Sequence, residues 1–338
     1  MKTNKPYIVA EMSGNHNQSL ERALEIIDAA AYAGVDAIKL QTYTADTLTL
    51  PGVYTIHDEK SLWNGRDLYD LYQEAHTPWE WHKALFDRAK EKGIICFSTP
   101  FDETAVDFLE SLDNPIYKIA SFEVNHIPLL KYIAKTGKPV IMSTGASTLS
   151  EIEEAVDTLR ENGCTDLTLL KCTSAYPATP ENTNLHTIPH LKQLFDCKAG
   201  LSDHTLGIGV AIASVALGAT VIEKHFCLSR AEGGVDSAFS MEPQEMKILV
   251  EEVNRACLAL GKVSYGVLEA EKNSRIFKRS IYVSKDIKAG EAFSVDNICC
   301  IRPASGLAPK YYNMILGKRA IKNIKTGTPL NCNLINND

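Results

Sequence analysis

Two histidines, His204 and His225, follow apolar segments with the character of strands, in the stretches GLSDHT and IEKHF. Neutral imidazole is the most common transition-metal ligand in proteins, and two rings leave other coordination positions for water and substrate. The pair therefore predicts a metal site with Lewis-acid chemistry. A spacing of 21 residues is also compatible with the alternative, a pair of core or general-base histidines.

Two lysines, Lys39 and Lys118, stand inside apolar runs, where an ammonium group needs a partner. Hydroxyl residues follow the neighbouring runs at Thr99, Ser121, Ser143, Ser174 and Ser202. Ammonium groups surrounded by hydroxyls suit phosphate or carboxylate, so the pattern predicts an anion pocket. The alternative is that each lysine extends to solvent or pairs with an interior acid such as Glu11 or Glu123.

These residues fall on a regular alternation of short apolar runs and amphipathic stretches. The expected strands are 7–11, 36–41, 94–99, 116–121, 139–144, 167–172, 198–202 and 220–225, and the clearest helical patterns are 20–33, 78–93, 148–163 and 243–261. Eight strand–helix units in the first 260 residues favour a (β/α)₈ barrel over an open sheet. Nearly every expected strand ends in polar groups, where such barrels carry their chemistry.

Local signals refine these elements. Gly34 is expected to end the first helix and Ser150 to cap the helix at 148–163. The connection 42–77 is far longer than usual and rich in aromatic residues, which predicts a lid or binding loop. We assign the remaining histidines at 57, 76, 82, 126, 186 and 190 to surfaces and loops.

Composition excludes several classes of protein. The formal charge of −7 gives no general attraction to nucleic acid or acidic membranes, and no apolar run has the roughly 20 residues of a membrane span. The apolar stretch near the start is too short for a signal peptide. Nine cysteines, an odd number without a C-x-x-C pair, favour a reducing, cytoplasmic compartment. Those in apolar runs, including Cys172, are interpreted as small hydrophobes.

After Gly261 the pattern changes to short β-type runs separated by Lys-x-Gly turns. DIKAGEAFSVDNI at 286–298 and NIKTGTPLNCNLI at 323–335 match at an offset of 37 residues. The match predicts two related β units in a small second domain.

A series of motifs resembles the sialic acid synthase family. They are IVAEMSGNHNQSLERALEIIDAAAYAGVDAIKLQTY, FSTPFDE, YKIASFE, STG, KCTSAYP, GLSDHT and IEKHF, followed by RSIYVSKDIKAGE, IRPASGL and GKRAIKNIKTG. The resemblance covers essentially the whole chain. It implies an α/β fold with a (β/α)₈ TIM barrel at 1–262, a linker at 263–278 and an antifreeze-protein-like (SAF) β-clip domain at 279–338. The implied reaction joins phosphoenolpyruvate to an acylated amino sugar.

The same resemblance implies roles for individual residues. Phosphoenolpyruvate would be held by Lys39, Thr99, Lys118, Ser121, Ser143, Ser174 and Ser202, the last but one being asparagine in many relatives. His204 and His225 would bind a divalent cation, Mn²⁺ or Mg²⁺. Glu123 would act as acid and base, with Glu11 also at the reaction centre. The sugar would contact Glu11, Gln41, Tyr176, Asp236 and Arg302. Arg302 would reach the partner's site in a domain-swapped homodimer.

Within the family, KLQTYTADTLTL, SLWNGRDLYDLYQEAHTPWEWH, GGVDSAFS and RPASGLAPK look most like pseudaminic acid synthases. This implies a 2,4-diacetamido-2,4,6-trideoxy-L-altrose substrate. Because that sugar is less polar at C6 than N-acetylmannosamine, we expect Trp63, Tyr69 and Tyr72 of the long connection to pack on its methyl group. Alternatives are an N-acetylneuraminate or legionaminate synthase, a Schiff-base aldolase using Lys39 or Lys118, and a sugar- or phosphate-binding protein without turnover.

Overall fold

A computed structural model describes residues 5–59 and 61–336. The chain divides after Gly261 into two compact units, and each is described by itself. No helix in the described ranges is long and apolar enough to cross a membrane.

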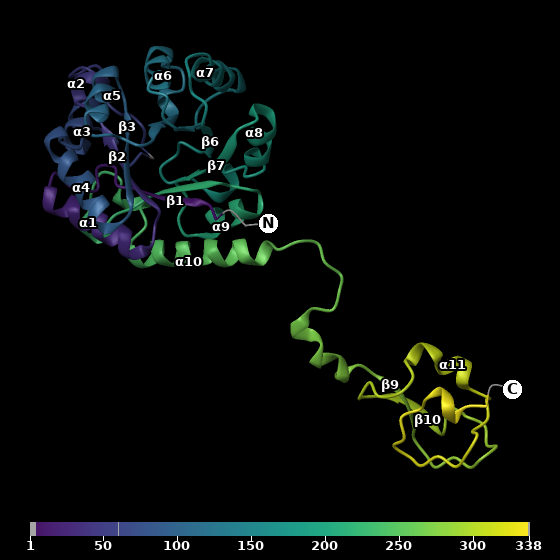
Figure 1. Ribbon diagram of the computed structural model, residues 1–338. Helices are drawn as coiled ribbons and strands as arrows, with labels where there is room; N and C mark the ends of the chain where they lie inside the picture. Colours follow the sequence, from purple (N-terminus) through teal and green to yellow (C-terminus); the bar gives the residue numbers. More distant parts are fainter. Residues whose placement is uncertain (1–4, 60, 337–338) are drawn as a thin grey trace. The chain divides into compact units, whose positions relative to one another are not determined.

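The first unit is a closed barrel of eight parallel strands that pair in sequence order (Figure 1). The strands are β1 (Tyr7–Glu11), β2 (Ala37–Thr42), β3 (Ile95–Pro100), β4 (Tyr117–Ile119), β5 (Val140–Ser143), β6 (Leu167–Cys172), β7 (Lys198–Asp203) and β8 (Val221–His225). Strand β1 closes the ring, because Glu11 pairs in register with Lys39 of β2 and with His225 of β8. The predicted (β/α)₈ fold is confirmed.

Helices surround the strands in Figure 1. They are α1 (Leu20–Ala33), α2 (Ala45–Leu48), α3 (Leu68–Ala75), α4 (His82–Lys92), α5 (Glu103–Glu110), α6 (Ile127–Ala134), α7 (Leu149–Glu161), α8 (Thr187–Phe195), α9 (Gly209–Ala216) and α10 (Pro243–Leu260). Short 3₁₀ turns are η1 (Trp79–Trp81), η2 (Ser121–Glu123), η3 (Pro180–Asn182), η4 (Arg230–Glu232) and η5 (Ser237–Phe239).

Capping residues explain where two of these helices begin or end. Gly34 ends α1 in the left-handed region with φ 84°, as predicted, since glycine adopts this conformation without strain. The predicted cap of α7 at Ser150 is wrong. Thr148 accepts the Glu151 backbone N–H, and the Glu151 side chain bonds back to Thr148, which places the start of α7 two residues earlier.

The barrel interior changes character along the strands. Apolar side chains fill its N-terminal half, at Val9, Ala37, Phe97, Ile141, Leu170 and Val221. Side chains two residues apart on a strand share a face, so the next inward positions are fixed. These positions are Glu11, Lys39, Thr99, Ser143, Cys172 and Glu223. An apolar layer of side chains therefore lies next to a layer of polar side chains at the C-terminal end of the barrel.

The long connection after β2 has secondary structure of its own. It contains α2 and α3, and an antiparallel bridge joins Thr55 to Asp67. The assignment of His82 to a surface is wrong, because its side chain is buried at the start of α4. Its Nε2 lies 2.8 Å from Thr42 Oγ1 and its Nδ1 lies 3.2 Å from the Pro78 carbonyl. Burial lowers the pKa of His82 to about 4, so the ring is neutral.

The second unit is a small β domain. It contains β9 (Ser280–Val283), antiparallel to β10 (Ile298–Ile301), and α11 (Tyr312–Ile315). Its 3₁₀ turns are η6 (Glu269–Glu271), η7 (Asn273–Phe277), η8 (Pro309–Tyr311) and η9 (Cys332–Leu334).

The 37-residue repeat is built into this domain's core. Ile287 and Ile324 occupy equivalent positions and exchange backbone hydrogen bonds of 2.9 and 2.8 Å. The other equivalent apolar pairs, Phe293 with Leu330 and Ile298 with Ile335, belong to the same core cluster. The two predicted β units therefore pair with each other.

Candidate active site

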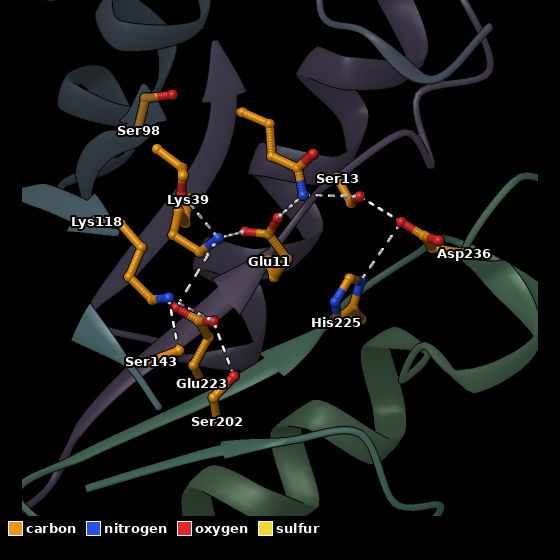
Figure 2. Close-up of polar contacts among 12 residues, drawn as sticks. Glu11, Ser13, Lys39, Ser98, Lys118, Ser143, Ser202, Glu223, His225 and Asp236 are labelled. Atoms are coloured by element: carbon orange, nitrogen blue, oxygen red, sulfur yellow. Dashed lines mark hydrogen bonds and ion pairs between the residues drawn. The ribbon is translucent and has the colours of Figure 1, made fainter. Parts of the chain in front are cut away.

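Lys39 lies at the centre of a polar network inside the barrel (Figure 2). Its Nζ forms an ion pair of 2.6 Å with Glu11 Oε2 and donates to Thr99 Oγ1 at 3.3 Å. Gln41 Nε2 donates to the other Glu11 oxygen at 2.8 Å, so a single carboxylate connects β1 to two residues of β2. All of these side chains come from sequence-predicted site positions.

Lys118 lies on β4, which is separated from β2 and Lys39 by strand β3. Its Nζ donates to Ser143 Oγ at 2.7 Å and to the Ile119 carbonyl at 3.1 Å. It forms an ion pair of 3.8 Å with Glu223, an acid that the alternative interpretation did not name. Figure 2 shows Lys39 and Lys118 converging on this one carboxylate.

Glu223 is a site residue that the sequence reasoning missed. Its carboxylate lies 4.0 Å from Lys39 Nζ and accepts a hydrogen bond of 3.1 Å from Ser202 Oγ. The available signal was the period of two in β8, which puts Glu223 on the same inward face as His225.

The pKa values of the two lysines are shifted in opposite directions. Burial lowers the pKa of Lys39, but Glu11 and Glu223 outweigh that effect and leave the pKa raised. At Lys118 burial dominates, and the pKa stays lowered although Glu223 opposes the shift. The lysines thus do pair with interior acids, as the alternative interpretation required, and they also lie beside the predicted hydroxyls.

Two more of the predicted hydroxyls, those of Ser121 and Ser174, lie next to Gly145. Its backbone N–H donates to Ser121 Oγ at 3.0 Å. A Cβ at position 145 would lie 2.8 Å from Ser121 Oγ and would collide with Ser174 Oγ, so only glycine leaves these hydroxyls in place. Thr99, Ser121, Ser143, Ser174 and Ser202 therefore all belong to one end of the barrel.

The two histidines come together at the ends of β7 and β8, with ring centroids 5.2 Å apart. His204 Nδ1 donates to the Thr173 carbonyl at 2.9 Å, which leaves its Nε2 for another partner. His225 Nδ1 is buried without a hydrogen-bond partner among the described residues, 3.8 Å from Asp236 Oδ2. Burial lowers the pKa of His225 well below its usual value, so its ring is neutral.

These rings fit a cation that completes its coordination with water and substrate. Neutral imidazole is the ligand form, which His225 has, and its unpartnered Nδ1 is the kind of donor that a metal requires. Among the described residues no group of three or more His, Cys, Asp and Glu side chains is arranged to hold a metal ion. The protein itself therefore offers two nitrogens, with Asp236 beside one of them.

Cys172 interacts with His204, which corrects its interpretation as a simple hydrophobe. Burial raises the pKa of the Cys172 thiol, but its hydrogen bond with His204 and the nearby charges lower it further, to about 7. Burial likewise lowers the pKa of His204, and the contacts with Cys172 and the Thr173 carbonyl leave it raised. The run LLKC gives no local sign of these polar neighbours.

Glu123 ends η2 at the mouth of the barrel. Its Oε2 is buried without a hydrogen-bond partner among the described residues. Burial raises the pKa of Glu123 to about 7, although Lys118 opposes the shift. A carboxyl group with a pKa near neutrality can both accept and return a proton, as the predicted acid–base role requires.

An aromatic wall borders the histidines. The Tyr176 ring lies 4.5 Å from His204 and 5.7 Å from Trp63, measured between centroids. Trp63 Nε1 donates to the Val235 carbonyl at 2.9 Å, which fixes the long connection over the site. By contrast, the Tyr69 hydroxyl donates to Asp46, away from the wall, and the Tyr72 ring packs on Tyr43.

The remaining predicted sugar contacts divide between the two units. Asp236 accepts a short hydrogen bond from Ser13 beside His225. Arg302 is exposed in the loop after β10, in the second unit.

Comparisons with known proteins give a consistent result. The signature of the NeuB family matches residues 26–265, and that of the SAF domain matches residues 278–332. A pseudaminic acid synthase of Campylobacter jejuni is 47% identical over 96% of this chain and 95% of its own length. A pseudaminic acid synthase of Helicobacter pylori is 44% identical over 96% of both chains.

A solved structure agrees with these relatives. It is the N-acetylneuraminic acid synthetase of Leptospira borgpetersenii in complex with citrate. It has a TM-score of 0.72 and 33% identity, over 80% of this chain and 90% of that one.

Proposed function

This chain belongs to the NeuB family of synthases, and we propose that it is a pseudaminic acid synthase. The reaction would join phosphoenolpyruvate and 2,4-diacetamido-2,4,6-trideoxy-L-altrose, with addition of water, into pseudaminic acid and phosphate. The observation that carries the proposal is the meeting of two buried lysines and five hydroxyls with a pair of histidines at one barrel end. Relatives 44–47% identical are named for this activity, which supports the choice of sugar.

The lysine end would bind the phosphate of phosphoenolpyruvate. Lys39 and Lys118 supply charge, and the hydroxyls of Thr99 and Ser143, which accept from these lysines, can donate to phosphate. Ser202 lies beside them and donates to Glu223. Because these donors are held in a buried layer, they need no rearrangement when negative charge develops on the leaving phosphate.

The histidine end would hold Mn²⁺ or Mg²⁺ on His204 and His225. A divalent cation there would supply Lewis-acid polarisation of the sugar aldehyde. The orphaned His225 nitrogen supports this proposal. Lys39 pairs with Glu11, and Glu11 is connected through Gln41 and Ser13 to Asp236 beside the histidines. Lys39 would therefore hold phosphoenolpyruvate close to that aldehyde.

Glu123 would handle the proton of the attacking water. When the enol carbon attacks the aldehyde, positive charge develops at C2 of the former phosphoenolpyruvate, and water adds there. Glu123 removes the water's proton, and phosphate then leaves with cleavage of the C–O bond. A carboxyl with a pKa of about 7 accepts that proton at neutral pH.

The sugar would lie towards the aromatic wall. Glu11, Gln41, Tyr176 and Asp236 border that region, and Arg302 of a partner subunit would complete it in a domain-swapped homodimer. Nine free cysteines, without a disulfide among them, support a reducing, cytoplasmic location.

A phosphate-release assay tests the proposal. The altrose-derived diacetamido sugar is compared with N-acetylmannosamine and with the gluco and manno diacetamido sugars. We expect phosphate release to be fastest with the altrose sugar. Preference for another sugar would reassign the substrate, and binding of phosphoenolpyruvate without turnover on any sugar would favour a binding protein.

Isotope labelling tests the bond that breaks. With ¹⁸O at the bridging position of phosphoenolpyruvate, C–O cleavage places the label in the released phosphate. Label retained in the sugar acid would show P–O cleavage instead.

A further inference from the structure

We propose that Glu223 is an internal counter-anion that competes with phosphate for Lys39 and Lys118 and so speeds phosphate release. The inference rests on the proposed function, because it takes the two lysines as the phosphate-binding groups. It assigns a role to a buried carboxylate that the proposed mechanism leaves without one.

The position of Glu223 is the first argument. Its carboxylate lies 3.8 Å from Lys118 Nζ and 4.0 Å from Lys39 Nζ, between side chains from two different strands. The three side chains are buried together, so their charges are poorly screened by water. Figure 2 shows Glu223 facing both ammonium groups.

The looseness of these contacts is the second argument. One residue further along β8, Lys224 forms a closed ion pair of 2.8 Å with Asp203 on the opposite face of the strand. Glu223 lies about an ångström farther from its lysines, and its Oε2 has no hydrogen-bond partner among the described residues. It neutralises the lysines without occupying their N–H donors.

The serine contact explains how Glu223 is held at this distance. Ser202 Oγ donates to Glu223 Oε1 at 3.1 Å and anchors the carboxylate to β7. Lys118 meanwhile directs two of its donors to Ser143 and the Ile119 carbonyl. An ammonium group has three donors, so one on Lys118 stays available to a ligand.

The consequence follows from Coulomb's law. A phosphate dianion that contacts both lysines lies close to a fixed negative charge, which lowers its affinity. The carboxylate balances the lysines again once phosphate leaves. A site with two buried lysines and no such acid would hold its product too tightly for rapid turnover.

The test is the Glu223→Gln variant, which keeps side-chain volume and the contact to Ser202 but removes the charge. Inorganic phosphate is the probe, as a competitive inhibitor against phosphoenolpyruvate. We expect its inhibition constant to fall about tenfold, because one nearby repulsive charge is lost. Phosphate release after a single turnover, followed by stopped flow, should slow, while KM for the sugar stays unchanged.

Glu110→Gln is the matched control. Glu110 also pairs with a lysine, Lys138, and accepts from a hydroxyl, that of Tyr117, but it lies on α5 outside the barrel. Its removal should leave phosphate inhibition unchanged.

An unchanged or raised inhibition constant in Glu223→Gln would overturn the inference. If that variant does not fold, Glu223→Asp is measured instead. This variant keeps the negative charge, but its shorter side chain withdraws from Ser202. Phosphate inhibition close to that of the wild type supports the counter-anion role, whereas weakened inhibition shows that Glu223 only positions the lysines. A wild-type protein without turnover or phosphate inhibition refutes the proposed function itself.

Discussion

His204 and His225 face each other with ring centroids 5.2 Å apart. The register of β7 and β8 produces this contact, because Asp203 at the end of β7 pairs with Lys224 of β8 and the next residue along each segment is a histidine. Adjacent strands lie about 4.8 Å apart, so side chains at matched positions meet without any loop rearrangement. The strand register therefore determines where the two histidines lie.

We predict that chelation abolishes turnover and that Mn²⁺ restores it, because the proposed mechanism assigns polarisation of the aldehyde to the cation. Direct titration with Mn²⁺, followed by calorimetry or electron paramagnetic resonance, should show one site per chain. His204→Gln should weaken that binding by at least tenfold, in the range of lost ligand contacts. The exposed His190→Gln is the control, and full turnover after exhaustive EDTA treatment contradicts the prediction.

The second prediction concerns pH. Glu123 must be ionised to accept a proton from water, and burial raises its pKa to about 7. The rate should therefore fall as pH decreases through about 7, where Glu123 becomes protonated. In Glu123→Gln this acid limb should disappear together with most of kcat, a loss of about 10²–10⁴-fold. An unchanged acid limb in the variant would assign it to another group.

The third prediction concerns sugar selectivity. Trp63 is separated from His204 by the single ring of Tyr176, so a sugar held at its aldehyde end presents its distal carbons to Trp63. Trp63→Ala should reduce the preference for the 6-deoxy sugar over N-acetylmannosamine by about tenfold, as expected for one lost apolar contact. The measurement is the ratio of the two kcat/KM values.

Tyr69→Ala is the matched control for Trp63, because its hydroxyl bonds to Asp46 away from the wall. An equal change of selectivity in both variants would show a general effect of the long connection rather than a contact of Trp63.

The polar layer of the barrel was predictable because its cause is local. Runs such as 7–11 and 167–172 have the predicted bounds, since near-continuous apolar segments form buried parallel strands. The period of two then determines which side chains face inward. Lys39 and Lys118 could be assigned to the interior on this basis alone.

The features that could not be predicted from the sequence depend on tertiary contacts. Trp63 is fixed by a carbonyl 172 residues away, and no local pattern indicates such a partner. His82 starts an ordinary amphipathic helix, and its burial depends on Thr42 of β2. The pairing of Lys118 with Glu223 has no local signal, because the two residues are far apart in sequence and barrel closure brings them together.

The fourth prediction concerns Lys224, a buried lysine that lies outside the candidate active site. Lys224 is buried in a 2.8 Å pair with Asp203 on the outer face of β8. Lys224→Met should lower the free energy of unfolding by about 3–5 kcal/mol, because it leaves a buried carboxylate without its counter-charge. Urea denaturation measures the effect, and KM for phosphoenolpyruvate should stay near its wild-type value.

Lys198→Met provides the comparison, since Lys198 and Asp166 also form a 2.8 Å pair but both side chains are about half exposed. Little measurable loss is expected for an exposed pair. Equal destabilisation by both substitutions would show that burial is not the deciding factor.

The fifth prediction tests whether Arg302 acts in the partner's site. Arg302→Ala and Lys118→Met should each be nearly inactive as homodimers, the first through loss of the sugar contact and the second through loss of phosphate binding. In a domain-swapped heterodimer, the intact barrel of one chain meets the intact Arg302 of the other. Such a heterodimer, isolated with two affinity tags, should recover about half of the wild-type activity, since one of its two sites is complete. If Arg302 serves its own barrel, both sites stay defective and mixing restores nothing.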